Sequence, residues 1–226
     1  MRVGIVGGGQ LAQMMAEAAA ALEVKITCLE PHKNCPAARV AHVIEGAYDD
    51  PTKLAQLIAQ VDVLTYEFEN VSPEALEQFA QQIPIYPSIE ALRKTQNRLT
   101  EKTFLNSLDI PTANFKAIHS LVDLEAAIEA IGFPAVLKTQ EGGYDGKGQW
   151  VLKSHADFVT VSEVLKTTPC ILEAWVDFER ELSLIAVRNT HSEIAFYPLI
   201  ENQHQDGILR ESQAPYVDDA LQADAE

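Results

Sequence analysis

The first 90 residues alternate short apolar, β-favouring runs with segments whose apolar residues recur at helical spacing. The runs predict strands over residues 3–6, 25–29, 61–66 and 83–86, and the helical spacing predicts helices over 11–22, 51–59 and 75–81. Asp50-Pro51 and Ser72-Pro73 each place a capping side chain before a proline, which is typical of a helix start. Strands that alternate with helices favour a Rossmann-like, mostly parallel sheet covered on both faces.

The pattern changes after Pro87. Helices are predicted over residues 89–94, 98–108, 121–131 and 155–166, and strands over 135–138, 149–152, 170–173, 180–188 and 193–199. This second part reads as an α+β unit with hairpins, so we expect domains over 1–95 and 96–226. Residues 216–226 resemble the opening of a helix whose partner sheet is absent. We therefore expect the chain to be the N-terminal part of a longer protein.

Composition and charge exclude several classes of protein. With 47% hydrophobic and 22% charged residues, the composition is that of a globular protein. The net charge of 17 − 33 = −16 repels phosphate backbones and anionic membranes, which argues against a nucleic-acid or membrane partner. Three cysteines without a CxxC pair argue against a disulfide scaffold or zinc knuckle and fit a reducing cytoplasm. No apolar run reaches the roughly 18 residues that span a bilayer.

The charge is unevenly spread. Residues 90–153 contain eight basic and eight acidic residues, so the other 162 residues carry the whole charge of −16. A neutral stretch within an acidic chain is what a small anionic ligand needs, although chance clustering of surface lysines explains the count equally well.

A glycine-rich turn joins the first strand to the first helix. Residues 7–12 fit G-x-G-x-x-A, and Glu30 ends the second strand about 20 residues later. A dinucleotide site is one interpretation, because glycines let a pyrophosphate approach a helix N-terminus while an acid binds the ribose. A helix N-terminus that binds some other phosphate is the broader alternative.

A second glycine-rich segment, residues 141–148, follows an apolar strand that ends in Lys138; we call it the glycine loop. Burying an ammonium costs several kcal/mol without an anion, so this lysine indicates a bound phosphate. The loop adds four glycines (142, 143, 146 and 148) and Lys147, which together suit a phosphate clamp. The spacing is not that of a Walker A motif, and the alternative is a long hairpin loop with incidental charges.

Two further segments carry candidate nucleotide contacts. The apolar strand end at residues 171–176 could offer backbone groups to an adenine, and Glu181 could bind ribose hydroxyls. An edge strand with solvated acids is an equally good interpretation. His204 lies in an unusually polar segment, 202–210, but a lone histidine is more often structural.

Several segments together resemble the N5-carboxyaminoimidazole ribonucleotide synthetase family of the ATP-grasp superfamily. They are GGGQL from Gly7, TYEFENV from Thr65, GGYDGKGQW from Gly142, YPL from Tyr197 and NQHQDGILR from Asn202. The resemblance runs over the whole chain. It implies a Rossmann-like pre-ATP-grasp domain over 1–95, then an ATP-grasp domain with a small lobe over about 110–172 and the start of a truncated large lobe over 173–226.

The resemblance implies an enzyme of purine biosynthesis that joins 5-aminoimidazole ribonucleotide, ATP and bicarbonate through carboxyphosphate. It implies ATP and Mg²⁺ as cofactors, with the magnesium ligands beyond position 226 and no metal site within this chain. It also implies a cytoplasmic homodimer without nucleic-acid or membrane partners. The chain by itself is not expected to be a complete catalyst.

The resemblance also assigns roles to residues of this chain. The implied ATP contacts are Arg98, Lys138, Gly143, Tyr144, Asp145, Gly146, Lys147, Gly148, Gln149, Glu173, Ala174, Trp175, Val176, Glu181 and His204. The implied substrate contacts are Gln10, Leu11, Glu67, Tyr144, Asp145 and Arg210, with Gln10 and Leu11 at the ribose phosphate. Asp145, Tyr144 and Lys147 are the catalytic candidates.

Two rival functions remain open from the sequence. One is a nicotinamide-dependent oxidoreductase built on the first glycine-rich turn, which would leave the glycine loop without a role. The other is a non-catalytic nucleotide-binding module, which an incomplete second domain would favour.

Overall fold

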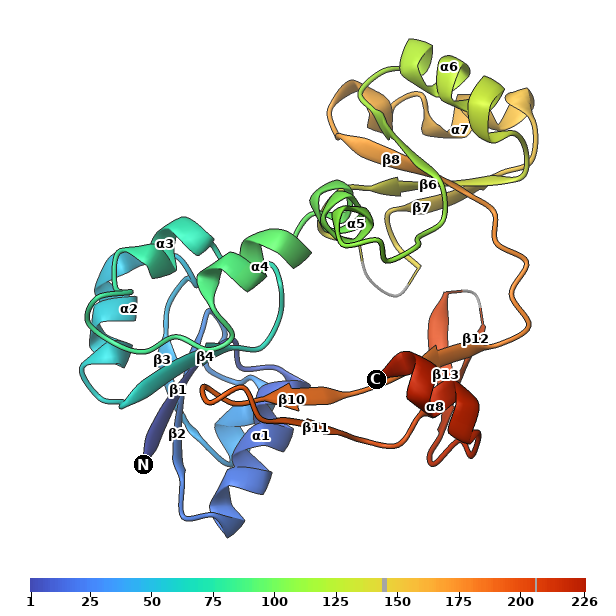
Figure 1. Ribbon diagram of the computed structural model, residues 1–226. Helices are drawn as coiled ribbons and strands as arrows, with labels where there is room; N and C mark the ends of the chain where they lie inside the picture. Colours follow the sequence, from blue (N-terminus) through green and yellow to red (C-terminus); the bar gives the residue numbers. More distant parts are fainter. Residues whose placement is uncertain (144–145, 206) are drawn as a thin grey trace. The chain divides into compact units, whose positions relative to one another are not determined.

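The computed structural model describes residues 1–143, 146–205 and 207–226 (Figure 1). The chain divides into two compact units, Met1–Ile110 and Pro111–Glu226. By this division α5 (Arg98–Ser107), which the sequence assigned to the second domain, belongs to the first unit.

The first unit is built on a four-stranded parallel sheet. Its strands are β1 (Arg2–Val6), β2 (Lys25–Glu30), β3 (His42–Glu45) and β4 (Val63–Tyr66), in the order β3-β2-β1-β4. The predicted strand at 83–86 is reduced to one bridge, between Leu64 and Ile85. Strand β3 was not predicted, because its four residues contain only two apolar ones, between polar neighbours, which is too short a pattern to stand out.

Helices of the first unit surround this sheet (Figure 1). They are α1 (Gln10–Ala21), the 3-10 helix η1 (Pro36–Arg39), α2 (Pro51–Ile58), α3 (Pro73–Glu77) and α4 (Ile89–Thr95), with α5 following. Ile5 and Cys28 pack in one apolar cluster, whereas their neighbours Val6 and Leu29 pack in another. Because adjacent strand residues point to opposite faces, both faces of the sheet are buried, as predicted.

Side-chain caps set the helix starts that the sequence predicted. Asp50 accepts hydrogen bonds from the N–H groups of Thr52 (2.8 Å) and Lys53 (3.2 Å), and Ser72 accepts one from Ala75 (3.1 Å). Each cap satisfies N–H groups that have no partner within the helix. Helix α3 is shorter than predicted and ends at Glu77.

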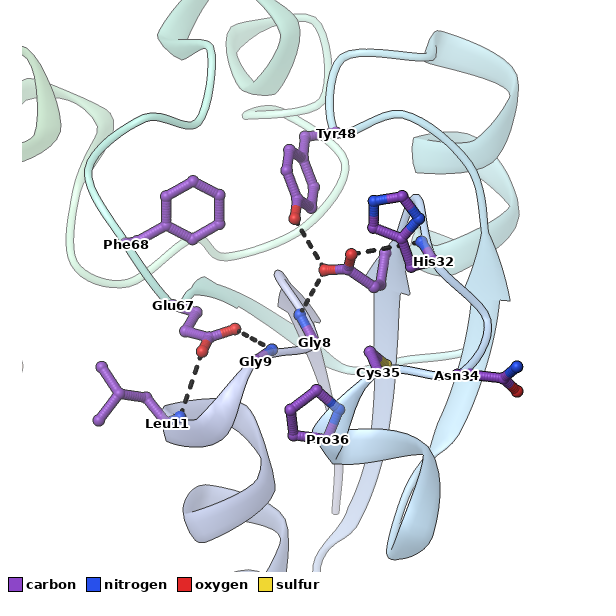
Figure 2. A pocket seen from close by; sticks show the side chains of 11 residues that line it. Gly8, Gly9, Leu11, His32, Asn34, Cys35, Pro36, Tyr48, Glu67 and Phe68 are labelled. Atoms are coloured by element: carbon purple, nitrogen blue, oxygen red, sulfur yellow. Dashed lines mark hydrogen bonds between the residues drawn. The ribbon is translucent and has the colours of Figure 1, made fainter. Parts of the chain in front are cut away.

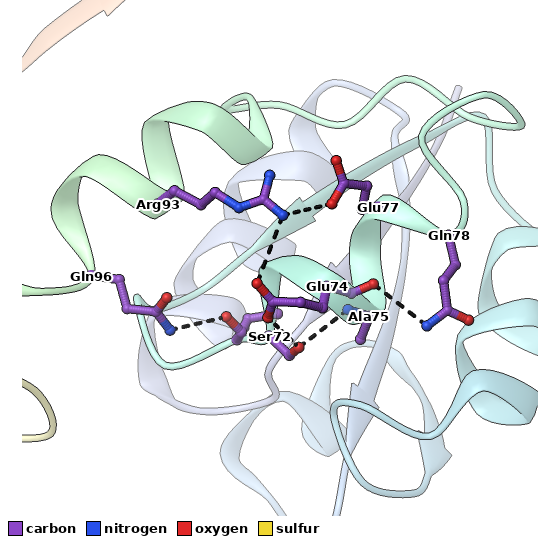
Figure 3. A network of polar contacts seen from close by, with 8 residues as sticks. Ser72, Glu74, Ala75, Glu77, Gln78, Arg93 and Gln96 are labelled. Atoms are coloured by element: carbon purple, nitrogen blue, oxygen red, sulfur yellow. Dashed lines mark hydrogen bonds and ion pairs between the residues drawn. The ribbon is translucent and has the colours of Figure 1, made fainter.

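Polar contacts join α3 to α4 (Figure 3). The Arg93 guanidinium lies 2.6 Å from the Glu77 carboxylate and 3.7 Å from that of Glu74, and it holds the pKa of Glu77 below its ordinary value. The Gln96 amide donates to the Val71 carbonyl at 3.3 Å. These contacts fix the start of the segment that leads into α5.

The second unit begins with an antiparallel sheet that packs helices on one of its faces. Its strands are β5 (Phe115–Ile118), β6 (Ala135–Thr139), β7 (Gln149–Leu152) and β8 (Cys170–Ala174), in the order β5-β8-β6-β7. Helix α6 (Leu121–Ile131) and the short helix α7 (Phe158–Val161) pack on this sheet through a cluster that includes Leu124, Leu137 and Leu172.

The predicted continuous helix over 155–166 is wrong. The structure has three short pieces there, which are η2 (His155–Asp157), α7 and η3 (Val164–Lys166). A capping box between Ser154 and Asp157 defines the first piece. Valine and threonine at 159–161, which lie within α7, lower the helix propensity of the whole segment.

The remaining strands form two small sheets. They are β9 (Glu181–Ser183), β10 (Ala186–Arg188), β11 (Ile194–Phe196), β12 (Ile200–Gln205) and β13 (Ile208–Gln213), followed by α8 (Asp219–Ala225). The predicted long strand 180–188 is divided, because β9 pairs with β12 whereas β10 pairs with β11. The β12–β13 hairpin was not predicted, because its polar sequence hides the strand pattern.

Removing the α2 cap should destabilise the first unit. We expect Asp50→Ala to lower the free energy of unfolding by about 1 kcal/mol, the ordinary cost of an N-cap, in urea unfolding followed by circular dichroism. Asp49→Ala removes the same charge one residue earlier at an exposed position and serves as the control. Equal unfolding midpoints for the two variants would contradict the role of the cap.

Candidate functional site

The first candidate region lies where the carboxyl ends of three parallel strands meet. The glycine-rich turn follows β1, Glu30 ends β2, and Glu67 comes directly after β4. The chain proceeds from β1 to β2 and β3 on one side and places β4 on the other side of β1. Ligands of open α/β sheets bind at such a reversal of strand order.

A cavity of about 500 Å³ opens at this edge (Figure 2). Two of its eleven described lining residues are carboxylates, and none of the eleven is a lysine or arginine. The lining residues are Gly8, Gly9, Leu11, Glu30, His32, Asn34, Cys35, Pro36, Tyr48, Glu67 and Phe68.

The two carboxylates bind the N–H groups of the turn (Figure 2). Glu30 accepts from Gly8 N–H (3.0 Å) and from the Tyr48 hydroxyl (2.7 Å). Glu67 accepts from the N–H groups of Gly9 (2.6 Å) and Leu11 (3.2 Å). In a dinucleotide site these N–H groups face the pyrophosphate. The arrangement places negative charge there instead, so it disfavours the dinucleotide interpretation.

Tyr48, which the sequence analysis did not single out, completes this wall. Burial and the hydrogen bond to Glu30 raise the pKa of its phenol above the ordinary value, so the hydroxyl stays neutral and acts as a donor. No local sequence pattern identifies Tyr48, because it lies in the loop between β3 and α2 and meets Glu30 only through the fold.

The predicted substrate residues Gln10, Leu11 and Glu67 lie together at the start of α1. Gln10 is its first residue and is exposed, and Leu11 lines the cavity. Gly7 has φ 116°, and a Cβ there would lie 2.7 Å from Glu67 Cβ, so only glycine allows this packing. A phosphate can reach Leu11 N–H only if Glu67 leaves it.

The second candidate region is the face of the β5-β8-β6-β7 sheet opposite its core. Lys138 pairs in register with Gln149 and Ile171, and Val136 pairs with Val151 and Glu173. Side chains directly opposite one another share a face. All six therefore point away from the cluster that holds Leu137 and Leu172. We call this surface the Lys138 face.

Lys138 and Glu173 form an ion pair on this face. Lys138 Nζ donates to Glu173 Oε2 at 2.9 Å, and the side chains are 28% and 8% exposed. The cost of burying an ammonium requires an anion beside Lys138, and the structure has one. This anion is the Glu173 carboxylate, whereas the sequence analysis expected a bound phosphate. A ligand phosphate at Lys138 would compete with Glu173.

The predicted adenine segment follows directly. Ala174 ends β8, and Trp175 and Val176 are exposed beyond it. A cavity of about 450 Å³ lies beside this segment, lined by Phe133, Pro134, Val151, Lys153 and Trp175. Its size and largely apolar lining suit a planar ring.

The glycine loop connects β6 to β7 at the end of β6 where Lys138 lies. Thr139 N–H donates to the Gly148 carbonyl at 2.8 Å, and Gly142, Gly146 and Gly148 have φ values of 69° to 74°. Gly143, Lys147 and Gln149 are described as well. The predicted catalytic residues Tyr144 and Asp145 lie outside the described residues.

The third candidate region is the β13-β12-β9 sheet. His204 Nδ1 lies 2.7 Å from Glu181 Oε2, so the structure brings these two predicted residues together. Asn202, two residues before His204 on β12, donates to Ser183 Oγ at 2.9 Å and accepts from Ser212 Oγ at 2.8 Å. Residues 202 and 204 lie on one face of the strand, because side chains alternate between faces. This spacing is the sequence signal that could have identified Asn202 as a neighbour of His204.

The two remaining predicted residues lie on separate elements. Arg210 is exposed on β13. Arg98 is the first residue of α5, whose N-cap is Asn97, and it is half-buried. It belongs to the first unit, whereas Lys138 belongs to the second.

Neither a metal site nor a membrane span is found in the described part of the chain. No group of three or more His, Cys, Asp or Glu residues there could hold a metal ion. Within the same residues, no helix combines the length and apolar character needed to cross a bilayer.

Two family models match the chain. The model "Ribonucleotide synthetase preATP-grasp domain" matches residues 1–96, and "ATP-grasp domain" matches residues 103–226. Among curated proteins, the N5-carboxyaminoimidazole ribonucleotide synthase of Pseudomonas aeruginosa is 44% identical over 95% of this chain, and that of Staphylococcus aureus is 38% identical over 94%. The chain spans 59% and 57% of the length of these two relatives.

Solved structures agree with these matches. The S. aureus N5-carboxyaminoimidazole synthetase complexed with ADP superimposes with a TM-score of 0.95 at 37% identity, covering 99% of this chain and 60% of that one. The Aspergillus clavatus enzyme, in complex with ADP and 5-aminoimidazole ribonucleotide, gives 0.89 at 32% identity with the same coverage. The resemblance found in the sequence is therefore confirmed. The ATP-grasp model matches more than half of the residues, and the chain belongs to the ATP-grasp family.

Proposed function

We propose that this chain forms the nucleotide- and substrate-binding part of an ATP-dependent carboxylase. Its reaction joins bicarbonate to 5-aminoimidazole ribonucleotide and gives N5-carboxyaminoimidazole ribonucleotide, ADP and phosphate, in purine biosynthesis. The Lys138–Glu173 pair carries the proposal, because it lies beside the glycine loop on the sheet face opposite the core. The relatives bound to ADP and to aminoimidazole ribonucleotide support it.

ATP is proposed to bind along the Lys138 face. The adenine lies in the apolar cavity at Val151 and Trp175, against the backbone of residues 173–176. The triphosphate extends toward Lys138 and the N–H groups of residues 143–149. The family resemblance adds Arg98 as a further phosphate contact. Glu181 and His204, already hydrogen-bonded to each other, bind the ribose hydroxyls.

The aminoimidazole ribonucleotide is proposed to bind at the first cavity. Glu67 and the turn at Gln10 and Leu11 hold its ribose phosphate portion. The family resemblance adds Arg210 as a further substrate contact. The Glu67 carboxylate already accepts the hydrogen bond of Leu11 N–H. Because this carboxylate is an acceptor and carries negative charge, it suits the sugar hydroxyls of the substrate better than its phosphate. Tyr144 and Asp145 are proposed to face the aminoimidazole ring.

The reaction needs charge neutralisation and exclusion of water. A bicarbonate oxygen attacks the γ-phosphorus and ADP departs, which leaves carboxyphosphate. Lys138 and Arg98 balance the charge of the phosphoryl group in transfer. The glycine loop with Lys147 protects the anhydride from hydrolysis. The substrate amine then attacks the carboxyl carbon, phosphate leaves, and Asp145 takes the amine proton. Mg²⁺ is the cation proposed to accompany ATP.

We propose a cytoplasmic homodimer as the working form. All three cysteines are free and buried, and burial raises the pKa of the Cys28 thiol to about 12. Thiols kept in this state suit a reducing compartment. Cys28 and Cys35 belong to the apolar cluster beneath the first sheet, which supports a packing role.

Lys138 can be tested apart from its effect on folding. We expect Lys138→Met to weaken ATP binding by at least about tenfold, since a charge-assisted hydrogen bond contributes about 1.5–3 kcal/mol. The same change leaves the Glu173 carboxylate without its lysine and should destabilise the fold by roughly 2–3 kcal/mol. Isothermal titration with ATP and thermal melting measure the two effects, in a chain extended to the full length of the relatives.

The double variant Lys138→Met/Glu173→Gln removes both charges and should recover most of the stability without recovering ATP affinity. Lys116→Met is the matched control, because Lys116 is exposed and its register with Leu172 puts it on the opposite face of the same sheet. ATP binding of normal strength by the double variant would refute the assignment of Lys138.

Asp145 should act on the carboxylation step and not on ATP binding. We expect Asp145→Asn in the extended chain to lower the rate of carboxylation by about 10²–10⁴-fold, the ordinary contribution of a general base. ATP affinity should stay near normal. Steady-state kinetics with both substrates measure this separation, and an equal loss of carboxylation and ATP affinity would refute the role.

ATP and NAD separate the proposed function from the oxidoreductase alternative. We expect ATP to raise the melting temperature of the protein and NAD to leave it unchanged, because the turn that would bind the NAD pyrophosphate already carries two carboxylates. Differential scanning fluorimetry at matched ligand concentrations is sufficient. Stabilisation by NAD alone would reverse the conclusion.

A further inference from the structure

The turn of the β12–β13 hairpin lies directly against the glycine loop. A Cβ placed on Gly207 would lie 2.8 Å from the Gly146 Cα and 3.1 Å from Gln149 Nε2. Real Cβ atoms essentially never approach another heavy atom within 3.0 Å, and their ordinary contacts lie at 3.4–4 Å. The two backbones therefore meet at a distance that only glycine at position 207 permits.

Both residues at this contact have the same unusual backbone conformation. Gly146 and Gly207 each have φ 74°, a region that residues with a side chain rarely adopt. Gly207 is thus required twice, once by the hairpin turn and once by the contact with Gly146. The hairpin could keep its turn with an asparagine, which tolerates positive φ, but no residue with a Cβ preserves the contact.

The contact joins two parts of the proposed ATP site. Gly146 and Gln149 belong to the segment proposed to surround the triphosphate. The hairpin strand β12 carries His204, which is bonded to Glu181 at the proposed ribose position. A displacement at Gly207 would therefore shift the phosphate-binding backbone relative to the ribose-binding pair.

We propose that Gly207 is a positioning residue, and that the β12–β13 turn is the surface on which the glycine loop docks. The inference rests on the proposed function, because it takes the glycine loop as the phosphate-binding element. The bare backbone of Gly207 sets how close the loop comes to the hairpin. A methyl group at 207 would have to move Gly146 by 3.0 − 2.8 = 0.2 Å to leave the range that real Cβ atoms never enter, and by 3.4 − 2.8 = 0.6 Å to reach ordinary contact.

Gly207→Ala in the extended chain tests the inference. We expect kcat/KM for ATP to fall by about 10²-fold, the cost of misplacing reacting groups by about 1 Å. Because the loop also shields carboxyphosphate in the proposed mechanism, phosphate release should exceed carboxylated product. Gly207→Asn tolerates the positive φ but still has a Cβ. It should lose as much activity as Gly207→Ala, and its melting temperature should lie closer to that of the unchanged protein.

Gly132→Ala is the matched control. Gly132 also has a positive φ (84°), but a Cβ there would have no neighbour within 4 Å, and it lies at the end of α6. This variant carries backbone strain without the steric contact, so it should melt lower and keep its kinetics with ATP. Amide hydrogen exchange of residues 146–149 gives a readout that does not depend on activity. Its rate should rise in both Gly207 variants and stay unchanged in Gly132→Ala.

The outcomes separate this inference from the function on which it rests. Normal kcat/KM, normal coupling and normal exchange in both Gly207 variants would overturn the docking contact while leaving the proposed function intact. Loss of activity in Gly132→Ala equal to that in Gly207→Ala would also overturn it, because strain alone would then explain the effect. If the unchanged protein neither binds nor hydrolyses ATP, the proposed function itself fails.

Discussion

The second unit depends on the cost of placing an ammonium at the end of an apolar strand. Lys138 follows three residues that pack within the sheet, so its charge needs a partner close by. Glu173 supplies that partner from the neighbouring strand β8, 2.9 Å away. The strand register that creates the pair also puts Gln149 and Val151 on the same face. The ion pair thus lies on the sheet face opposite the core, which is the face proposed to receive ATP.

The first unit also has polar groups that need partners, but here they are backbone N–H groups of a turn and not a side-chain ammonium. Its glycine-rich turn exposes N–H groups at a helix start, which need acceptors whether or not a ligand is bound. Glu30 and Glu67 supply the acceptors from adjacent strand ends. The same short motif that binds pyrophosphate in dinucleotide enzymes therefore belongs here to a negatively charged cavity. A motif specifies N–H groups in space, whereas the fold decides what they bind.

Much of the architecture could be predicted from the sequence, because the parallel sheet, the proline-marked helix starts and the order of domains rest on local patterns. The break-up of residues 155–166 and the β12–β13 hairpin could not, since each depends on competition between weak local propensities and tertiary pairing. At the site, Lys138 was found because its position is costly, and Glu67 only through the family resemblance. Tyr48 and the contact at Gly207 carry no sequence signal, because they exist only after distant segments meet.

The carboxylate of Glu67 at the start of α1 has a consequence for how a ligand is received. Since the N–H groups at the helix start are satisfied by side chains of the same chain, the fold itself sets the shape of the cavity, and no folding step has to be coupled to ligand binding. This arrangement determines which ligands can bind. A ligand that takes the N–H groups of the turn must offer new hydrogen-bond donors to the Glu67 carboxylate, and any other ligand must leave the existing hydrogen bonds intact. The start of the helix therefore selects against ligands that would place an anionic group beside Glu67.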